Sequence, residues 1–318
     1  MTCYDLCVAW NWEHDADFVA LLDATCRSRG LSMLQITPDN LTQVWPAVED
    51  GQITFQVYLD RASEVDARFA PFVQWARSYA RYRINPHEQA SLAWDKSRMH
   101  RHLIDVGLYT PHTIVLPPYA EQPHVPAIDL SPLGDRFTIK PAHGSGGVGV
   151  VMEATSLQQI LAARQEHAND AYLLQAHVAP VQLGSRVAWF RVLFCAGRVY
   201  PCWWDTGTHV YTPVTSAEEY EFGLQPLRDI LASVARVCGL EMFSTEIAFT
   251  AEGRFVIVDY ANDQIDLRLQ SKAADGVPDH IVLDMADRVV GLVQTHAPPY
   301  GTTFMAELAQ TPDQGGSI

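Results

Sequence analysis

The sequence predicts an α/β fold that opens with a small parallel α/β domain. Over the first 83 residues, apolar runs of strand length alternate with segments of helical periodicity. Further along, pairs of apolar runs are joined by short glycine-containing turns, as in antiparallel hairpins. The chain has 318 residues, 48% of them hydrophobic and 19% charged, so it is long enough for two or three domains with their own cores.

The first predicted unit, residues 1–84, is a sheet layered between helices. Its predicted strands are residues 3–10, 31–37 and 53–59, and its predicted helices are residues 15–29 and 66–83. Phe18 and Leu22 share one face of the first helix, and Gly30 is a typical helix stop. Strands that alternate with helices form parallel sheets covered on both faces.

The next predicted element is one long helix. Asn85 is a typical N-cap and Pro86 a typical first helical residue, and the helical pattern continues past Lys96 to a stop at Gly107. Several prolines in residues 117–132 then indicate a linker or an irregular loop.

Residues 137–151 predict a β-hairpin with an unusual turn. An apolar strand delivers Lys140, and a turn with little side-chain bulk follows, containing Gly144, Ser145, Gly146 and Gly147. Backbone N–H groups in such a turn can approach an anion closely, which favours a phosphate-binding hairpin. The lysine precedes the glycines and a strand follows them, which excludes a Walker A loop and a Rossmann turn. The alternative is an ordinary tight hairpin with a surface lysine.

The rest of the chain continues with helices and hairpins. Predicted helices are residues 156–167, 225–238 and 279–293, and predicted strands are residues 172–178, two strands within 188–204 that turn at Ala196-Gly197, 243–250 and 254–260. Residues 297–318 are rich in Pro, Gly, Thr and Gln, so we expect a poorly ordered tail.

Charge and cysteine content narrow the classes of partner. The formal net charge is −15, which argues against a nucleic-acid or anionic-membrane partner. The six cysteines show no metal-binding spacing and lie mostly among apolar residues, so we expect buried thiols in a reducing compartment. Neither a signal peptide nor an apolar run of about 18–20 residues is found, and we therefore expect a cytoplasmic protein.

The order of motifs resembles the ATP-grasp superfamily and is similar to its RimK-type glutamate-ligase and glutathione-synthetase-like branches. The motifs are Asp95-Lys96, residues 107–111, Lys140 with its hairpin, residues 173–178, residues 190–192, residues 245–247 and residues 258–262. The resemblance covers about residues 84–293. It implies an N-terminal α/β domain at residues 1–84 that precedes an ATP-grasp domain at residues 85–296. The parts of the ATP-grasp domain would be a linker and helix at 85–135, a lid subdomain at 136–180 and a C-terminal subdomain at 181–296.

The resemblance assigns two lysines to ATP. Lys96 would reach a phosphate from the side opposite the hairpin, whereas Lys140 would hold the α- and β-phosphates and take part in catalysis. The hairpin residues Gly144, Ser145, Gly146 and Gly147 would contact the nucleotide as well. The alternative for Lys96 is a solvated helix lysine.

The strand at 172–178 resembles the hinge between the two grasping subdomains. The resemblance implies that Gln175, His177 and Val178 lie at the adenine edge. The family commonly has an acidic residue after the glutamine, and here that position is Ala176. The alternative is a plain buried strand.

A charged residue on a predicted strand, Arg191, is the expected catalytic cation. It would neutralise charge on the γ-phosphoryl group and on the acyl-phosphate transition state. Nearby Arg186 competes for the same role, and an edge-strand surface arginine is the structural alternative.

The resemblance implies a Mg²⁺ site on two neighbouring strands. Glu246 and Asp259 are the expected carboxylate ligands, because Mg²⁺ takes one or two carboxylates together with phosphate oxygens. The family usually places an asparagine two residues after the last acid, whereas Asn262 follows Asp259 by three. Either a β-bulge corrects the register, or Asp263 takes the role.

Residues past the metal strand border the acceptor site in this family. Arg268 and Lys272 are therefore candidates for binding a substrate carboxylate, and loop charges that face water are the alternative. The turn Trp203-Trp204-Asp205, with His209 and Tyr211, is interpreted as the edge of a packed aromatic core rather than as an acceptor pocket.

The implied activity is an ATP- and Mg²⁺-dependent ligase that joins a small-molecule carboxylate to an amine through an acyl phosphate. A small-molecule kinase on the same scaffold and a non-catalytic nucleotide-binding protein are the alternatives. Because many members of this superfamily are dimers, a homodimer is one expected state.

Overall fold

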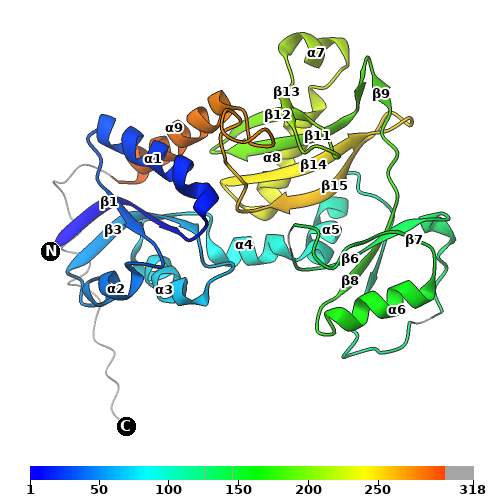
Figure 1. Ribbon diagram of the computed structural model, residues 1–318, viewed down its shortest axis with the longest axis horizontal. Coiled ribbons are helices and arrows are strands. Elements are labelled where there is room, and N and C mark those ends of the chain that lie inside the picture. Colours follow the sequence, from blue (N-terminus) through cyan, green and yellow to red (C-terminus); the bar gives the residue numbers. More distant parts are fainter. Residues whose placement is uncertain (126, 145, 298–318) are drawn as a thin grey trace.

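The computed structural model describes residues 1–125, 127–144 and 146–297. Figure 1 shows three main parts: an N-terminal α/β domain, a lid built on a four-stranded sheet, and a five-stranded sheet between them. Within this described part of the chain, no helix is long and apolar enough to cross a membrane.

The N-terminal domain is a parallel sheet of order β2-β1-β3-β4, with helices on both faces. Its strands are β1 (Thr2–Trp10), β2 (Met33–Ile36), β3 (Ile53–Arg61) and β4 (Tyr82–Ile84), and its helices are η1 (Glu13–Asp15), α1 (Ala16–Ser28), α2 (Leu41–Glu49), η2 (Ala67–Phe69) and α3 (Ala70–Tyr79). On β1, Leu6 and Val8 pack with α1 and the C-terminal helix, whereas Cys7 and Ala9 pack with α2 and α3. The predicted two-sided parallel sheet is confirmed.

The predicted helix at 66–83 is wrong at both ends. The regular helix α3 covers only Ala70–Tyr79, after the short 3₁₀ turn η2, and Tyr82–Ile84 form β4 beside β3. Edge pairing with β3 outweighs the local helical pattern here, and a strand of three residues carries too little periodicity to be detected.

The predicted continuous helix after Asn85 is also wrong, because it is two helices. α4 (His87–Trp94) ends before Asp95, and α5 (Lys96–Asp105) begins after it. The Asp95 side chain accepts hydrogen bonds from the backbone N–H groups of Ser97 and Arg98, so it is an N-cap inside the predicted helix. Lys96 is consequently the first residue of a helix.

The lid is an antiparallel sheet of order β5-β8-β6-β7. Its elements are β5 (Thr113–Leu116), η3 (Ser131–Leu133), β6 (Phe137–Pro141), β7 (Val151–Ala154), α6 (Leu157–Glu166) and β8 (Tyr172–Ala176). The predicted hairpin is present, but its second strand begins at Val151 because residues 147–149 are in the turn. β5 was not predicted and lies ahead of the proline-rich loop.

The five-stranded sheet is antiparallel and has the order β13-β12-β11-β14-β15. The elements of this part are β9 (Gln182–Leu183), β10 (Arg186–Val187), β11 (Trp189–Cys195), β12 (Arg198–Trp204), β13 (Tyr211–Pro213), α7 (Ser216–Glu221), α8 (Pro226–Cys238), β14 (Met242–Phe249), β15 (Phe255–Asn262) and α9 (Asp279–His296). Ala196 and Gly197 both have left-handed φ values, 45° and 79°, as the predicted hairpin turn requires.

None of the six cysteines forms a disulfide bond, and all but Cys3 are buried. The expected burial of most thiols is thereby confirmed. Burial raises the pKa of the Cys26 thiol to about 11, and nearby carboxylates raise it further. The expected disorder of the tail concerns residues that lie outside the described part of the chain, apart from Ala297, which is buried behind α9.

Candidate active site

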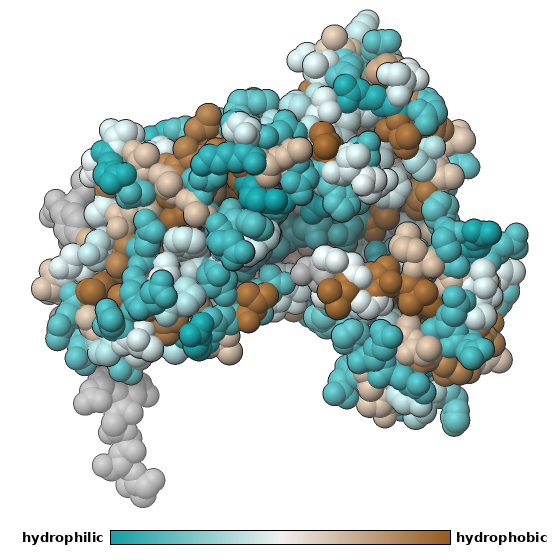
Figure 2. Space-filling model, viewed as in Figure 1, coloured by the Kyte–Doolittle hydropathy of each residue, from teal (hydrophilic) through white to brown (hydrophobic). Residues whose placement is uncertain are grey.

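The candidate active site lies where the lid, the five-stranded sheet and the N-terminal domain meet. Figure 2 shows the surface hollowed between these parts, with hydrophilic side chains in the hollow. A small cavity there is lined by residues of all three parts, including Glu64, Lys96, Gly144, Asp259 and Asn262. The chain therefore brings together charged residues that are up to about two hundred positions apart in sequence.

Lys140 on β6 is a buried lysine, with 7% of its surface exposed. Its Nζ donates a hydrogen bond to the carbonyl oxygen of Val258 at 3.1 Å and lies 5.2 Å from the ring centre of Tyr260. Burial lowers its pKa to about 8, and neighbouring Lys96 acts in the same direction whereas Asp259 opposes the shift. The ammonium group has three N–H donors, and the one hydrogen bond described for it leaves donors that an anionic ligand can accept from.

Lys96 approaches the glycine-rich hairpin from α5. Its Nζ donates to the carbonyl oxygen of Gly144 at 2.5 Å, and its backbone N–H donates to the carbonyl oxygen of Ala142. The chain contains three lysines, and two of them, Lys96 and Lys140, lie at this hairpin.

The hairpin turn needs glycine for conformational reasons. Gly144, Gly146 and Gly147 have φ values of 116°, 62° and 75°, which side chains disfavour. Ser145, the fourth predicted nucleotide contact of this turn, lies outside the described residues. The turn thus keeps its backbone accessible beside the two lysines.

Gln175 on β8 is turned into the protein interior. Its side chain is 3% exposed, and its Nε2 donates to the Tyr260 hydroxyl at 2.7 Å. The same hydroxyl lies 2.8 Å from Nδ1 of His100, so β8, β15 and α5 are joined through one phenol group. His100 and Tyr260 had no role in the sequence-based interpretation. His177 and Val178 follow β8, and the imidazole of His177 is 57% exposed, 3.9 Å from a Glu153 oxygen.

The two predicted acidic ligands face each other. Glu246 on β14 is the register partner of Asp259 on β15, while Ser244 pairs with Asn262. Between these two pairs, one residue on β14 opposes two on β15, which is a β-bulge. The bulge turns Asn262 toward Asp259, to whose Oδ2 it donates a hydrogen bond at 2.8 Å.

Asp263, the other residue considered for this position, is engaged elsewhere. Its Oδ1 accepts hydrogen bonds from the Asn85 side chain at 2.7 Å and from the backbone N–H of Gln264 at 2.9 Å. Burial raises its pKa to about 6, against the effect of the Asn85 hydrogen bond. The β-bulge of the first alternative is present, and the choice of Asn262 to complete the acidic set remains a prediction.

Arg191 on β11 completes the cluster. Its Nη1 donates to Oε1 of Glu246 at 3.0 Å, and its guanidinium lies 5.1 Å from the ring centre of Trp204. Burial opposes its charge, but Tyr211, Glu246 and Asp259 outweigh this and raise the pKa of Arg191. The competing Arg186 lies over Trp203 instead, 5.5 Å from the ring centre.

The two carboxylates differ in their electrostatic surroundings. Burial raises the pKa of Glu246, and Asp259 adds to the shift while Arg191 opposes it. Burial also disfavours the charge of Asp259, but Lys140 and Lys96 outweigh it and lower the pKa of Asp259. Asp259 is thus held as an anion between two lysines, whereas Glu246 depends on Arg191 or another cation for its charge.

The acidic set fits a hard cation that brings further oxygen ligands. Glu246, Asp259 and the amide of Asn262 offer oxygen atoms within one strand pair. In the described ranges, no group of three or more His, Cys, Asp or Glu residues is placed to hold a metal by itself. Two carboxylates without a closed cage are what Mg²⁺ uses when it is bound together with phosphate.

Glu64 is a member of the site that sequence reasoning missed. It follows β3 of the N-terminal domain and lines the small cavity with Lys96 and Asp263. Burial raises its pKa to about 7, Asp263 adds to the shift and Lys96 opposes it. The available signal was its position after the carboxyl end of a parallel strand, where α/β sheets place ligand-binding residues.

The structure pairs the two predicted substrate cations with carboxylates of the chain itself. Arg268 forms ion pairs with Asp266 at 2.6 Å and Asp275 at 3.0 Å. Lys272 forms an ion pair with Asp17 on α1 at 2.6 Å. Neither residue joins the cluster of Lys140, Glu246 and Asp259, and their predicted role in binding a substrate remains a prediction.

A scan against protein-family models and a search of curated proteins found no match. Solved structures do resemble the chain. The D-alanine–D-alanine ligase of Bacillus anthracis complexed with ATP has a TM-score of 0.61 at 13% identity, covering 91% of this chain and 98% of its own. A RimK-domain ATP-grasp protein of Sphaerobacter thermophilus has a TM-score of 0.61 at 20% identity, covering 90% and 99%.

A third similar structure is the ATP-grasp ligase PsnB in complex with the precursor peptide PsnA2 and AMPPNP. Its TM-score is 0.60 at 14% identity, covering 91% of this chain and 98% of that one. At such identities the likeness concerns the fold, and it extends over nearly the whole length of both chains.

Proposed function

The chain has the ATP-grasp fold, and we propose that it is an ATP-dependent ligase that joins a carboxylate to an amine. The observation that carries the proposal is the convergence of Lys140, Arg191 and the facing pair Glu246 and Asp259 beside a glycine-rich hairpin. Phosphoryl transfer asks a protein chiefly for positioning and charge neutralisation, which such a set provides.

The proposed reaction has two steps. An oxygen of the substrate carboxylate attacks the γ-phosphorus of ATP, ADP leaves, and an acyl phosphate forms. The amine then attacks the acyl carbon, the phosphate leaves with the oxygen that came from the carboxylate, and the amine gives up a proton as the amide forms.

Each residue of the cluster has a proposed part in the first step. Lys140 and Lys96 contact the phosphates from the two sides of the hairpin, and Arg191 neutralises charge on the transferred phosphoryl group and on the attacking carboxylate. The lid sheet and its hairpin cover the site and exclude water, which would otherwise hydrolyse the acyl phosphate.

Mg²⁺ is the cofactor that the acidic set fits, and Glu246, Asp259 and Asn262 are its proposed ligands. When bound, it would neutralise charge on the phosphates. Bound Mg²⁺ would also compensate the charge of Glu246, and Arg191 would then be available to the reacting groups.

The proposed substrates are small molecules or peptides, since the similar ligases are described with D-alanine or with a precursor peptide. The expected cytoplasmic location, the absence of nucleic-acid and membrane partners, and a homodimer remain predictions.

The test is ATP consumption with Mg²⁺ and a pooled library of amino acids and small carboxylates, with hydroxylamine as a substitute amine. The proposal expects hydroxamate and ADP, and loss of both in Lys140→Ala. Arg27→Ala is the control, because it removes an exposed cation of the N-terminal domain that has no proposed part in the site. A stable phosphate ester in place of hydroxamate would indicate a kinase instead.

A further inference from the structure

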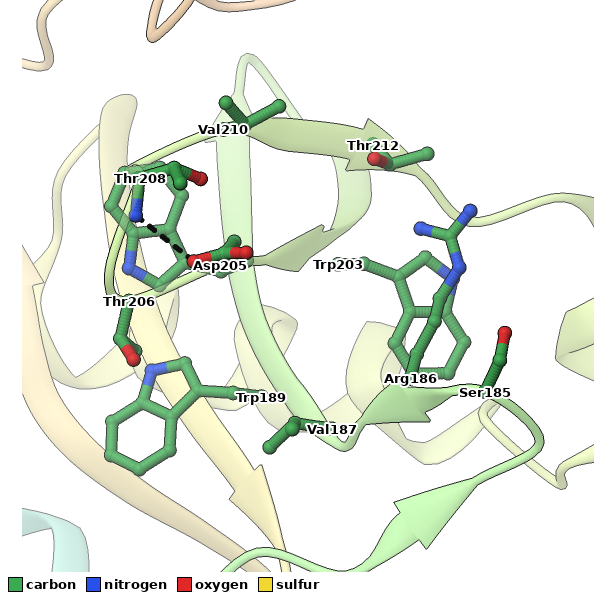
Figure 3. A pocket seen from close by; sticks show the side chains of 11 residues that line it. Ser185, Arg186, Val187, Trp189, Trp203, Asp205, Thr206, Thr208, Val210 and Thr212 are labelled. Atoms are coloured by element: carbon green, nitrogen blue, oxygen red, sulfur yellow. Dashed lines mark hydrogen bonds between the residues drawn. The ribbon is translucent and has the colours of Figure 1, made fainter.

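A pocket of about 470 Å³ lies next to the candidate active site, between β10, β12 and the turn that leads to β13. Figure 3 shows its lining side chains arranged around a hollow. The wall includes three tryptophans, Trp189, Trp203 and Trp204, with Arg186 at one side. The volume is that of pockets which bind small organic molecules.

Two of the tryptophans that line this pocket contact residues of the proposed catalytic cluster. The indole Nε1 of Trp189 donates a hydrogen bond to Oε2 of Glu246 at 3.1 Å. The ring of Trp204 lies under the guanidinium of Arg191, with 5.1 Å between them. The indoles of Trp189 and Trp204 therefore lie between the pocket and the pair Glu246 and Arg191, one side chain away from them.

The far end carries a positive charge without a close partner. Figure 3 places Arg186 across the hollow from Trp189. The Arg186 side chain is 40% exposed, and within the described residues its one ion pair is with Glu218 at 3.9 Å. The guanidinium carbon lies over the ring of Trp203, 5.5 Å from its centre, a cation–π contact that helps to position the N–H groups.

The pocket wall also carries one carboxylate, that of Asp205. Oδ1 of Asp205 accepts hydrogen bonds from the backbone N–H groups of Gly207 and Thr208, both at 2.9 Å, so Asp205 closes the turn. These bonds lower the pKa of Asp205. Arg186 is the cationic side chain among the residues that line the pocket, and it is the group there that can bind an anion.

Indole side chains form much of the apolar wall of the pocket. Trp203 and Trp204 are buried in the sheet, and Tyr211 packs on Trp204 with 4.5 Å between ring centres. The interpretation of this turn as a packed aromatic edge is correct for their buried sides, but both indoles also line the pocket. Rigid indole faces bind planar groups well, because little side-chain entropy is lost.

We propose that the pocket binds a substrate that carries a second anionic group, separated from its reacting carboxylate by a planar aromatic segment. Arg186 binds the distal anion, the indoles contact the planar segment, and the reacting carboxylate lies beside Arg191 and Glu246. The inference rests on the proposed function and names the substrate class for the same site.

The test measures binding by calorimetry with the full chain and two compounds. 1,4-Phenylenediacetate has a ring between two carboxylates, and phenylacetate has the same ring and one carboxylate. The wild type is expected to bind the diacid about tenfold more tightly or better, since a charge-assisted contact is worth at least that factor. Arg186→Gln removes this preference, whereas Arg198→Gln on the same sheet, with its side chain 58% exposed, keeps it.

A second variant tests whether the aromatic ring of the two compounds lies in this pocket. Thr206 lies on the exposed turn and lines the pocket, so Thr206→Trp fills the hollow without removing Arg186. It is expected to weaken binding of both compounds.

Binding of ATP with Mg²⁺ is measured on the same wild-type sample. If ATP fails to bind, the proposed function is wrong. If ATP binds and the diacid shows no preference that depends on Arg186, or does not bind, the pocket inference alone is overturned.

Discussion

Asn262 donates a hydrogen bond to Asp259 across a β-bulge that places an extra residue between them. The bond fixes the Asp259 carboxylate and brings the amide oxygen of Asn262 to the same side of the strand. Register alone would turn a residue three positions away to the opposite face. The bulge is therefore the local feature on which the proposed Mg²⁺ site depends.

Removing this amide is expected to weaken Mg²⁺ binding. In Asn262→Ala, the Mg²⁺ concentration for half-maximal ATP turnover should rise by about tenfold or more, as for other residues that hold a metal ligand in place. The control is Asn169→Ala, which changes an exposed asparagine in the lid. An unchanged Mg²⁺ requirement in Asn262→Ala would exclude Asn262 from the site.

The low pKa of Lys140 predicts a pH dependence of ATP binding. With a pKa of about 8 in the free protein, the ammonium loses its proton as the pH rises through that value, and the charged form is the one that binds phosphate. ATP affinity should therefore fall between about pH 7 and pH 9.5. Lys140→Arg keeps its charge over this range, so its residual affinity should vary little with pH. Equal slopes for the two proteins would contradict this assignment.

The Asp95 cap predicts a coupled effect on stability and nucleotide binding. Asp95→Ala removes two hydrogen bonds from backbone N–H groups and one from the Ser97 hydroxyl at the start of α5, and should lower the free energy of unfolding by about 1 kcal/mol. Because Lys96 is the next residue, ATP affinity should fall as well. Thr215→Ala removes the cap of α7, far from Lys96, and should lower stability alone. Denaturant unfolding and ATP titration of both variants distinguish the two effects.

The buried hydroxyl of Tyr260 joins the lid strand to the five-stranded sheet. Tyr260→Phe leaves Gln175 and His100 without this partner, which should cost about 1–3 kcal/mol of stability. Tyr220→Phe changes an exposed tyrosine on α7 and is expected to be neutral. Urea unfolding measures both, and an equally small effect in the two variants would show that the hydroxyl contributes little.

Local sequence patterns predicted the features that are themselves local. The alternation in residues 1–59 predicted the parallel sheet, and the left-handed turn at Ala196-Gly197 followed from residue type. The break at Asp95 was missed because an aspartate inside a helical pattern has a weak signal until its side chain is seen to cap the next helix. The domain borders expected at residues 84, 135, 180 and 296 remain predictions.

The candidate site could be predicted only in part, for a related reason. Lys140 and its glycines are neighbours in sequence, whereas the contact between Glu246 and Arg191 depends on strand register. Glu64 belongs to the N-terminal domain, and no sequence pattern indicates that it lies beside Lys96 in the same cavity. Long-range register and domain packing therefore determine the remainder of the site.

The central claim is tested most directly by measuring whether an oxygen atom of the substrate carboxylate is transferred to the released phosphate. A carboxylate identified in the hydroxamate screen is labelled with ¹⁸O in both oxygens, and the phosphate released during ligation is analysed by mass spectrometry. Activation as an acyl phosphate transfers one labelled oxygen to each phosphate. Phosphate without the label would show that the carboxylate never attacked the γ-phosphorus and would contradict the proposed ligase mechanism.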